Sequence, residues 1–198
     1  MISVQQALRI LRDNIPEPQK ISVPLEEAHC CFLFEEIRAP EPSPRYTNSA
    51  MDGFAVRWAD CRGAGKESPA TLRIIGESQA GIPFDGVLTA GTAVRISTGA
   101  MLPAGADSVV RVEDTSEKES RVEVREIRAL GQDVRSAGEE FQEGEQLFAK
   151  GYRLGSRELA LLASFGIYQV PVYAPPKVSL LVTGTELASP ADQTIQPH

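Results

Sequence analysis

Apolar residues at helical spacing open the chain. Four of them share one face at positions i, i+3, i+4 and i+7, namely Val4, Ala7, Leu8 and Leu11. Ser3 and Gln6 have the spacing of a capping box, so the helix is expected to begin directly after Ser3. Pro16 ends it. A strand over Lys20–Pro24, a short helix over 25–31 and a strand near 33–38 are expected to follow.

The pattern changes to β from residue 46 to about residue 124. Short runs rich in β-branched residues are separated by glycines and prolines, and they cover 54–56, 71–75, 93–97, 109–112 and 122–124. Short strands with frequent turn signals are typical of a compact barrel or sandwich. The prolines at 40, 42 and 44 form a stiff connector before this region and indicate a domain boundary.

Helical periodicity returns near the end of the chain. Ser156 is the expected N-cap, Leu159 and Leu162 lie on the apolar face, and Gly166 stands where a C′ glycine belongs. A strand over 168–173 is expected next.

The apolar run 178–182 has the pattern of a buried parallel strand that opens an α/β domain. Such a strand needs a crossover helix and a neighbouring strand, and the residues that follow show no apolar periodicity. We expect the rest of that domain to be absent; an unusual tail is the alternative.

Composition narrows the function classes. The net charge is −7, which argues against a general nucleic-acid surface or an anionic membrane as partner because phosphate binding needs clustered cations. The three cysteines have no CxxC spacing, so free thiols in a reducing compartment are expected. Neither a signal peptide nor a long apolar stretch is found, and a cytoplasmic protein is expected.

Two glycine turns carry candidate chemistry. In Asn48-Ser-Ala-Met-Asp-Gly-Phe-Ala-Val56, the Asp52 carboxylate at a tight turn can coordinate Mg²⁺ through oxygen. Further on, a strand runs into Thr98-Gly99, where backbone N–H groups and the Thr98 hydroxyl can hold an anion. An ordinary turn is the alternative reading of each.

Two further segments carry charged candidates. Arg135 can pair with a phosphate in a bidentate way, and Glu139 and Glu140 can be metal ligands; a solvated charged loop is the alternative. Glu186, in Thr183-Gly-Thr-Glu-Leu187, would lie at the carboxyl end of the expected parallel strand, where α/β domains bind ligands. That role depends on the rest of the sheet.

Taken in order, the motifs resemble one family over essentially the whole chain. The chain is similar to the molybdopterin molybdenumtransferase (MoeA and gephyrin E-domain) family. The motifs that carry this similarity are N-S-A-M-D-G-F-A-V, R-I-S-T-G-A, V-R…G-E-E, L-L-A-S-F-G and T-G-T-E-L. The resemblance implies insertion of molybdate into adenylylated molybdopterin with release of AMP, assisted by Mg²⁺. It also implies a homodimer and a molybdopterin adenylyltransferase as pathway partner.

The resemblance implies a mixed α+β, β-rich fold. Residues 1–19 and 176–198 would be remnants of an α/β domain, of which only the first strand is present. Residues 20–44 and 141–175 would form an elongated α/β dimerisation domain. Residues 45–140 would be a compact β domain inserted into it.

Site residues are carried over by motif. Asp52, Thr98 and Glu186 would be catalytic, and the metal ligands would be Asp52, Glu140 and Glu186. The substrate-binding residues would be Ser49, Met51, Gly53, Gly99 and Arg135. The sequence departs from the family pattern at Tyr46-Thr47, at Glu140 and at Thr185, which leaves the metal binding and activity of this chain in question.

Two other function classes compete with a transferase. A non-catalytic dimerising or binding module derived from the same family fits a chain that lacks most of the α/β domain. A hydrolase with a Ser/His/Asp triad is poorly supported, because the histidines are His29 and His198 and no G-x-S-x-G motif is present.

Overall fold

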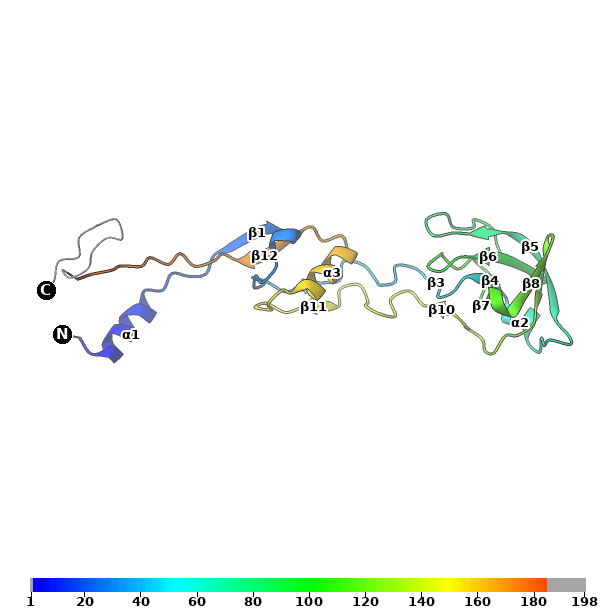
Figure 1. Ribbon diagram of the computed structural model, residues 1–198, viewed down its shortest axis with the longest axis horizontal. Helices are drawn as coiled ribbons and strands as arrows, with labels where there is room; N and C mark the ends of the chain where they lie inside the picture. Colours follow the sequence, from blue (N-terminus) through cyan, green and yellow to red (C-terminus); the bar gives the residue numbers. More distant parts are fainter. Residues whose placement is uncertain (1, 185–198) are drawn as a thin grey trace, which may run out of the picture.

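The protein is an elongated rod in this computed structural model, which describes residues 2–184 (Figure 1). Helix α1 (Val4–Asp13) and the extended segment 174–184 lie at one end, and a curled sheet lies at the other (Figure 1). A smaller body of short strands and a helix lies between them. Among residues 2–184, no helix combines the length and apolar character that crossing a bilayer requires.

Helix α1 forms as its spacing predicts. The Ser3 side chain accepts a hydrogen bond from the Gln6 N–H, and the Gln6 side chain accepts one from the Ser3 N–H, so the predicted capping box is confirmed. The helix buries none of its residues, and its apolar face remains exposed.

The middle body joins two distant parts of the chain. Its elements are β1 (Lys20–Pro24), the 3-10 helix η1 (Leu25–Glu27), β2 (Ile37–Arg38), β11 (Gln146–Phe148), α3 (Ser156–Ser164) and β12 (Gln169–Tyr173). Strand β1 pairs antiparallel with β12, and β2 pairs antiparallel with β11. Their apolar faces and α3 enclose one core, formed by Ala28, Leu33, Ile37, Leu154, Leu162, Val170 and Val172.

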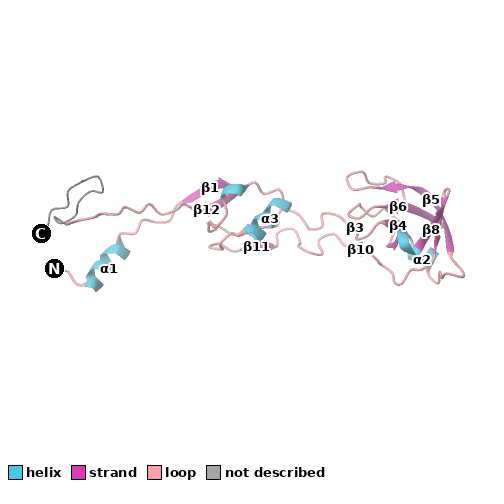
Figure 2. Cartoon of the chain, viewed as in Figure 1, coloured by secondary structure: helices cyan, strands magenta, loops and turns pink. Residues whose placement is uncertain are grey.

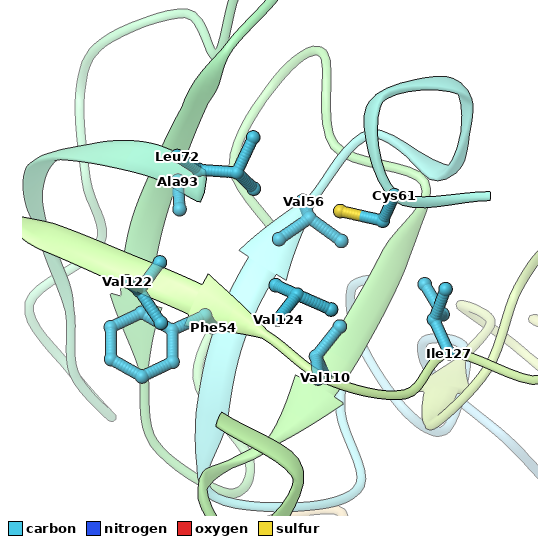
Figure 3. Packing of buried hydrophobic residues seen from close by; sticks show 9 residues of the cluster. All are labelled: Phe54, Val56, Cys61, Leu72, Ala93, Val110, Val122, Val124 and Ile127. Carbon is cyan, nitrogen blue, oxygen red and sulfur yellow. The ribbon is translucent and has the colours of Figure 1, made fainter. Parts of the chain in front are cut away.

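The β region forms a six-stranded sheet in the order β7-β4-β6-β5-β9-β8. Its strands are β4 (Gly53–Val56), β5 (Ala70–Ser78), β6 (Thr92–Ile96), β7 (Ser108–Arg111), β8 (Thr115–Lys118) and β9 (Arg121–Val124). Only the β5–β6 pair is parallel within this sheet. The sheet curls around buried side chains from several strands, which Figure 3 shows together with Cys61 of α2 (Trp58–Cys61).

Two short strands connect the curled sheet to the middle body. Strand β3 (Asn48–Ser49) pairs antiparallel with β10 (Val134–Arg135). The remaining short element, the 3-10 helix η2 (Val112–Asp114), directly follows β7 in the curled sheet. In Figure 2 the β3 and β10 strands lie on the side of the curled sheet that faces the middle body. The segment just before β4 is therefore fixed where the two bodies join.

Several expected elements differ in the structure. The helix expected over 25–31 is limited to η1, since Cys30 has a φ of 67°, which a right-handed helix cannot contain. The strand expected near 33–38 is reduced to β2, and Leu33 only bridges to Val172. The N-cap of α3 is Gly155 rather than Ser156.

The expected parallel strand over 178–182 is not formed. No strand is assigned to the described part of this segment, and Val178, Leu180 and Leu181 are 84–89% exposed. A strand needs a partner to accept its backbone hydrogen bonds, and the described residues offer none there. Thr185 and Glu186 lie outside the described residues.

Candidate functional site

The Asp52 carboxylate is held in one orientation by Thr98. Its Oδ1 accepts a hydrogen bond of 2.7 Å from the Thr98 N–H and one of 3.0 Å from the Thr98 hydroxyl. The backbone bond first, and then the hydroxyl bond, lower the pKa of Asp52 below its ordinary value. The side chain is exposed, so it is an anchored carboxylate open to solvent.

Strand register brings these two residues together. Gly53 of β4 pairs with Ile96 of β6, so the residue before β4 meets the turn that follows β6. In that turn Gly99 has a φ of 78°, a conformation that glycine adopts without strain. The Gly99 N–H donates to the Ser49 carbonyl at 2.8 Å, which fixes the turn against β3.

Gly53 and Ser49 have structural reasons for their identity. A Cβ on Gly53 would lie 1.9 Å from the Val110 carbonyl oxygen of β7, so only glycine allows the two strands to approach. The Ser49 hydroxyl donates to the Met51 carbonyl at 2.6 Å and accepts from the Met51 N–H at 3.2 Å. Ser49 thus shapes the turn before Asp52, and roles of Ser49, Met51 and Gly53 in substrate binding stay predictions.

A small cavity of about 160 Å³ opens beside Asp52. It is lined by Asp52, Gly53, Phe54, Arg95, Ile96, Ser97, Val112 and Glu117. The Arg95 guanidinium lies 5.8 Å from the centre of the Phe54 ring and pairs with Glu117 of the edge strand β8. The carboxylate of Asp52 is therefore next to a small hollow that combines apolar side chains with the Arg95–Glu117 pair.

Arg135 and Glu140 form a separate charged cluster. Arg135 donates to Glu139 at 2.7 Å and to Glu140 Oε1 at 2.5 Å, while the Ser43 hydroxyl donates to Glu140 Oε2 at 2.8 Å. These contacts lower the pKa of Glu139 and Glu140. The Arg135 guanidinium is already neutralised, and both Glu140 oxygens are engaged.

The candidate metal ligands fit Mg²⁺ unequally. Mg²⁺ usually binds through one or two carboxylates plus substrate phosphates. Asp52 fits this use, because both Thr98 bonds go to Oδ1 and leave Oδ2 available within the described chain. Residues 2–184 contain no cluster of three His, Cys, Asp or Glu side chains that could hold a metal, and Glu186 lies outside that range.

A second cavity of about 310 Å³ lies where the two bodies meet. Residues 41–46, Asn48, Gly99, Ser164 and Phe165 line it. Asn48 is 6% exposed, and its Oδ1 has no hydrogen-bond partner among the described residues. Gly99 is the residue shared between this cavity and the turn that holds Asp52.

Sequence reasoning missed two residues near the site, Arg111 and Asp133. They form a bidentate ion pair with two N–O distances of 2.8 Å. The Asp133 carbonyl also accepts a hydrogen bond from Ala50 in the turn before Asp52. The chain gives no local signal for this pair, since 22 residues separate its members; the only hint is an Asp after Gly131-Gln, in a loop where Asp tolerates positive φ.

Known proteins resemble this chain closely. A protein named molybdopterin molybdenumtransferase from Staphylococcus epidermidis is 34% identical over 192 residues, which are 97% of this chain and 46% of that protein. One of the same name from a Nostoc species is 39% identical over 201 residues, covering 100% of this chain and 46% of the relative. The chain thus spans about half the length of the curated relatives it matches.

Solved structures and a family description agree with these relatives. The crystal structure of a molybdopterin biosynthesis MoeA protein from Pyrococcus horikoshii has a TM-score of 0.84 and 33% identity, covering 98% of this chain and 49% of that one. The family described as the MoeA N-terminal region, domains I and II, matches residues 2–166. Since that match takes in most of the sequence, the whole curled sheet and most of the middle body, the chain belongs to the MoeA family.

Proposed function

We propose that this chain supplies one wall of a molybdopterin molybdenumtransferase site in molybdenum cofactor biosynthesis. The reaction inserts molybdate into adenylylated molybdopterin and releases AMP. The anchored Asp52 carboxylate carries the proposal, because it is ionised near neutral pH, held in one orientation by Thr98 and open to solvent. The names of the relatives supply the reaction class.

Each residue of the site has a defined task in this proposal. Cleaving the phosphoanhydride bond develops negative charge on the phosphates, and a Mg²⁺ ion held there would neutralise it. Asp52 would hold that cation through the oxygen that Thr98 leaves free, and the two Thr98 bonds would keep the carboxylate in one orientation. Ser49, Met51, Gly53 and Gly99 form the turns that face the substrate.

The other predicted residues complete the proposed site. Arg135 and Glu140 are paired in the free chain. Arg135 therefore releases Glu140 before it binds a substrate phosphate. The same release would free Glu140 for the metal. Glu186 would act from the opposite wall. Homodimerisation through residues 20–44 and 141–175 and supply of substrate by a molybdopterin adenylyltransferase belong to the same proposal.

A chimera tests this function directly. Residues 1–198 replace the matching part of the Nostoc relative, and AMP release and molybdenum-loaded pterin are measured with adenylylated molybdopterin, molybdate and Mg²⁺. Turnover that Asp52→Asn abolishes would support the proposal. A folded chimera without turnover, when the complete Nostoc protein is active under the same conditions, would overturn it. That result would favour the non-catalytic binding module.

A further inference from the structure

The Arg111–Asp133 pair differs from the other ion pairs of the curled sheet. The Arg111 Nε and Nη2 atoms each lie 2.8 Å from one Asp133 oxygen, in the two-pronged geometry that fixes both side chains. The Asp133 side chain is only 11% exposed. By contrast, Lys118 on β8 meets Glu123 through a single 3.2 Å contact, and its side chain is 71% exposed.

The pair closes a ring around the turn that carries Asp52. On one side, Arg111 pairs with Gly53 in the sheet, and the next residue, Val112, donates its N–H to the Asp52 carbonyl at 3.1 Å. On the other side, the Asp133 carbonyl accepts the Ala50 N–H at 2.9 Å. Both ends of the segment Ala50–Gly53 are thus tied to the two members of one ion pair.

Asp133 is itself held in an uncommon backbone conformation. Its φ is 52°, which Asp and Asn tolerate better than other side chains because they bond locally. The preceding Gln132 carbonyl accepts the Val109 N–H at 2.9 Å, which anchors the loop to β7. Because β7 also contains Arg111, the 131–133 loop and the Arg111 guanidinium are both anchored to the same strand.

We propose that Arg111 and Asp133 are positioning residues that hold the Asp52 carboxylate against Thr98. The bidentate pair adds a rigid side-chain link between β7 and the 131–133 loop, beside the Val109–Gln132 backbone bond. Both linked segments bond directly to the turn that carries Asp52. When the pair is lost, the turn gains freedom and the Asp52–Thr98 bonds lengthen. The catalytic consequence of this inference rests on the proposed function, whereas its structural part does not.

The structural part is tested on the 198-residue chain by NMR. Asp133→Asn removes the charge but keeps a residue that tolerates positive φ, and Glu123→Gln is the matched control in the same sheet. Two signals are followed: the Thr98 amide shift and the titration midpoint of the Asp52 carboxyl carbon. In Asp133→Asn the Thr98 amide shift moves and the midpoint rises toward the ordinary aspartate value. In the control both stay unchanged.

Two arginine variants separate positioning from simple folding. Arg111→Lys keeps the charge without the planar fork, so it raises the Asp52 midpoint less than Arg111→Gln does. Adding Asp133→Asn to Arg111→Gln gives no further change, because the interaction is already absent. Wild-type values of both signals in folded Asp133→Asn and Arg111→Gln would overturn the inference.

Turnover distinguishes the failure of this inference from the failure of the proposed function. In the Nostoc chimera, Asp133→Asn lowers kcat by about 10–100-fold with little change in KM, as expected when a catalytic group is misplaced by about 1 Å. A moved Asp52 midpoint with unchanged kcat would support the positioning role and contradict the catalytic role of Asp52. An unmoved midpoint with reduced kcat would overturn the positioning role.

Discussion

At the scale of single residues, Thr98 controls the ionisation of Asp52. The folded-state pKa of Asp52 lies below its ordinary value, so this carboxylate stabilises the fold above the unfolded-state pKa of about 4. The contribution disappears as the pH falls through the folded-state pKa. The same bonds keep Asp52 charged, and able to bind a cation, at lower pH than an isolated aspartate.

Thr98→Val removes the hydroxyl bond and leaves the backbone bond. Since the backbone N–H is the larger cause of the shift, the pKa of Asp52 rises only part of the way to its ordinary value. An NMR titration of the Asp52 carboxyl carbon measures this change. Thr98→Ser keeps the hydroxyl and serves as the control. A midpoint in Thr98→Val equal to that in Thr98→Ser would show that the hydroxyl bond is not formed in solution.

Gly53 should tolerate no larger side chain. A Cβ at this position meets the Val110 carbonyl at 1.9 Å, and backbone atoms on both strands must move to relieve the contact. Gly53→Ala is expected to lower the free energy of unfolding by about 1–3 kcal/mol or more, as overpacking does. Gly65→Ala is the control, because no atom lies within 4 Å of its added Cβ. Urea denaturation of both variants provides the comparison, and equal midpoints would contradict the close strand approach.

The residues of the site differ in how visible they are in the sequence. Asp52 stands in a glycine turn just before one predicted strand and Thr98 in a glycine turn just after another, so their placement at strand ends follows from local pattern. That they touch follows from the β4–β6 register, which depends on tertiary pairing. Arg111 and Asp133 could not be predicted, because their ion pair depends on a left-handed residue and on a contact between distant segments.

At the scale of elements, the strands rich in β-branched residues were predictable and the polar ones were not. Strands β4, β6, β7 and β9 lie close to the predicted runs because each buries β-branched residues in the sheet core. Strand β8, by contrast, reads Thr-Ser-Glu-Lys, and only Thr115 is buried. It exists because it pairs with β9 as an edge strand, and edge strands carry charged residues.

Helices α1 and α3 have similar apolar spacing but different surroundings. Leu162 of α3 is fully buried in the middle body, whereas Leu8 of α1 is 56% exposed. Leu162→Ala should therefore cost about 2–5 kcal/mol of unfolding free energy through lost burial and a residual cavity. Leu8→Ala should change it by less than about 0.5 kcal/mol.

Chemical denaturation followed by circular dichroism measures both leucine variants. The comparison also tests whether a second copy of the chain packs against the apolar face of α1. A large loss of stability in Leu8→Ala that grows with protein concentration would mean that the apolar face of α1 is covered by a second copy. The expectation for α1 would then be wrong in solution.

At the scale of the whole molecule, the middle body and the curled sheet have separate hydrophobic cores. The core around Leu33, Leu162 and Val172 shares no residue with the core around Phe54, Val110 and Val122. The connection between them consists of short pairings such as Ser43 with Phe141, and β3 with β10. Two cores joined by so few backbone contacts are expected to unfold as separate cooperative units.

Leu33→Ala tests that independence. Leu33 is fully buried in the middle body, so its truncation should destabilise that body by about 2–5 kcal/mol. Hydrogen exchange should then accelerate at Val170 and Val172, while Val122 and Val124 in the curled sheet keep their protection. Val122→Ala is the reciprocal variant and should give the opposite pattern. If both variants accelerated exchange equally in both bodies, the two would form a single cooperative unit, and the turn carrying Asp52 would depend on the stability of the whole rod.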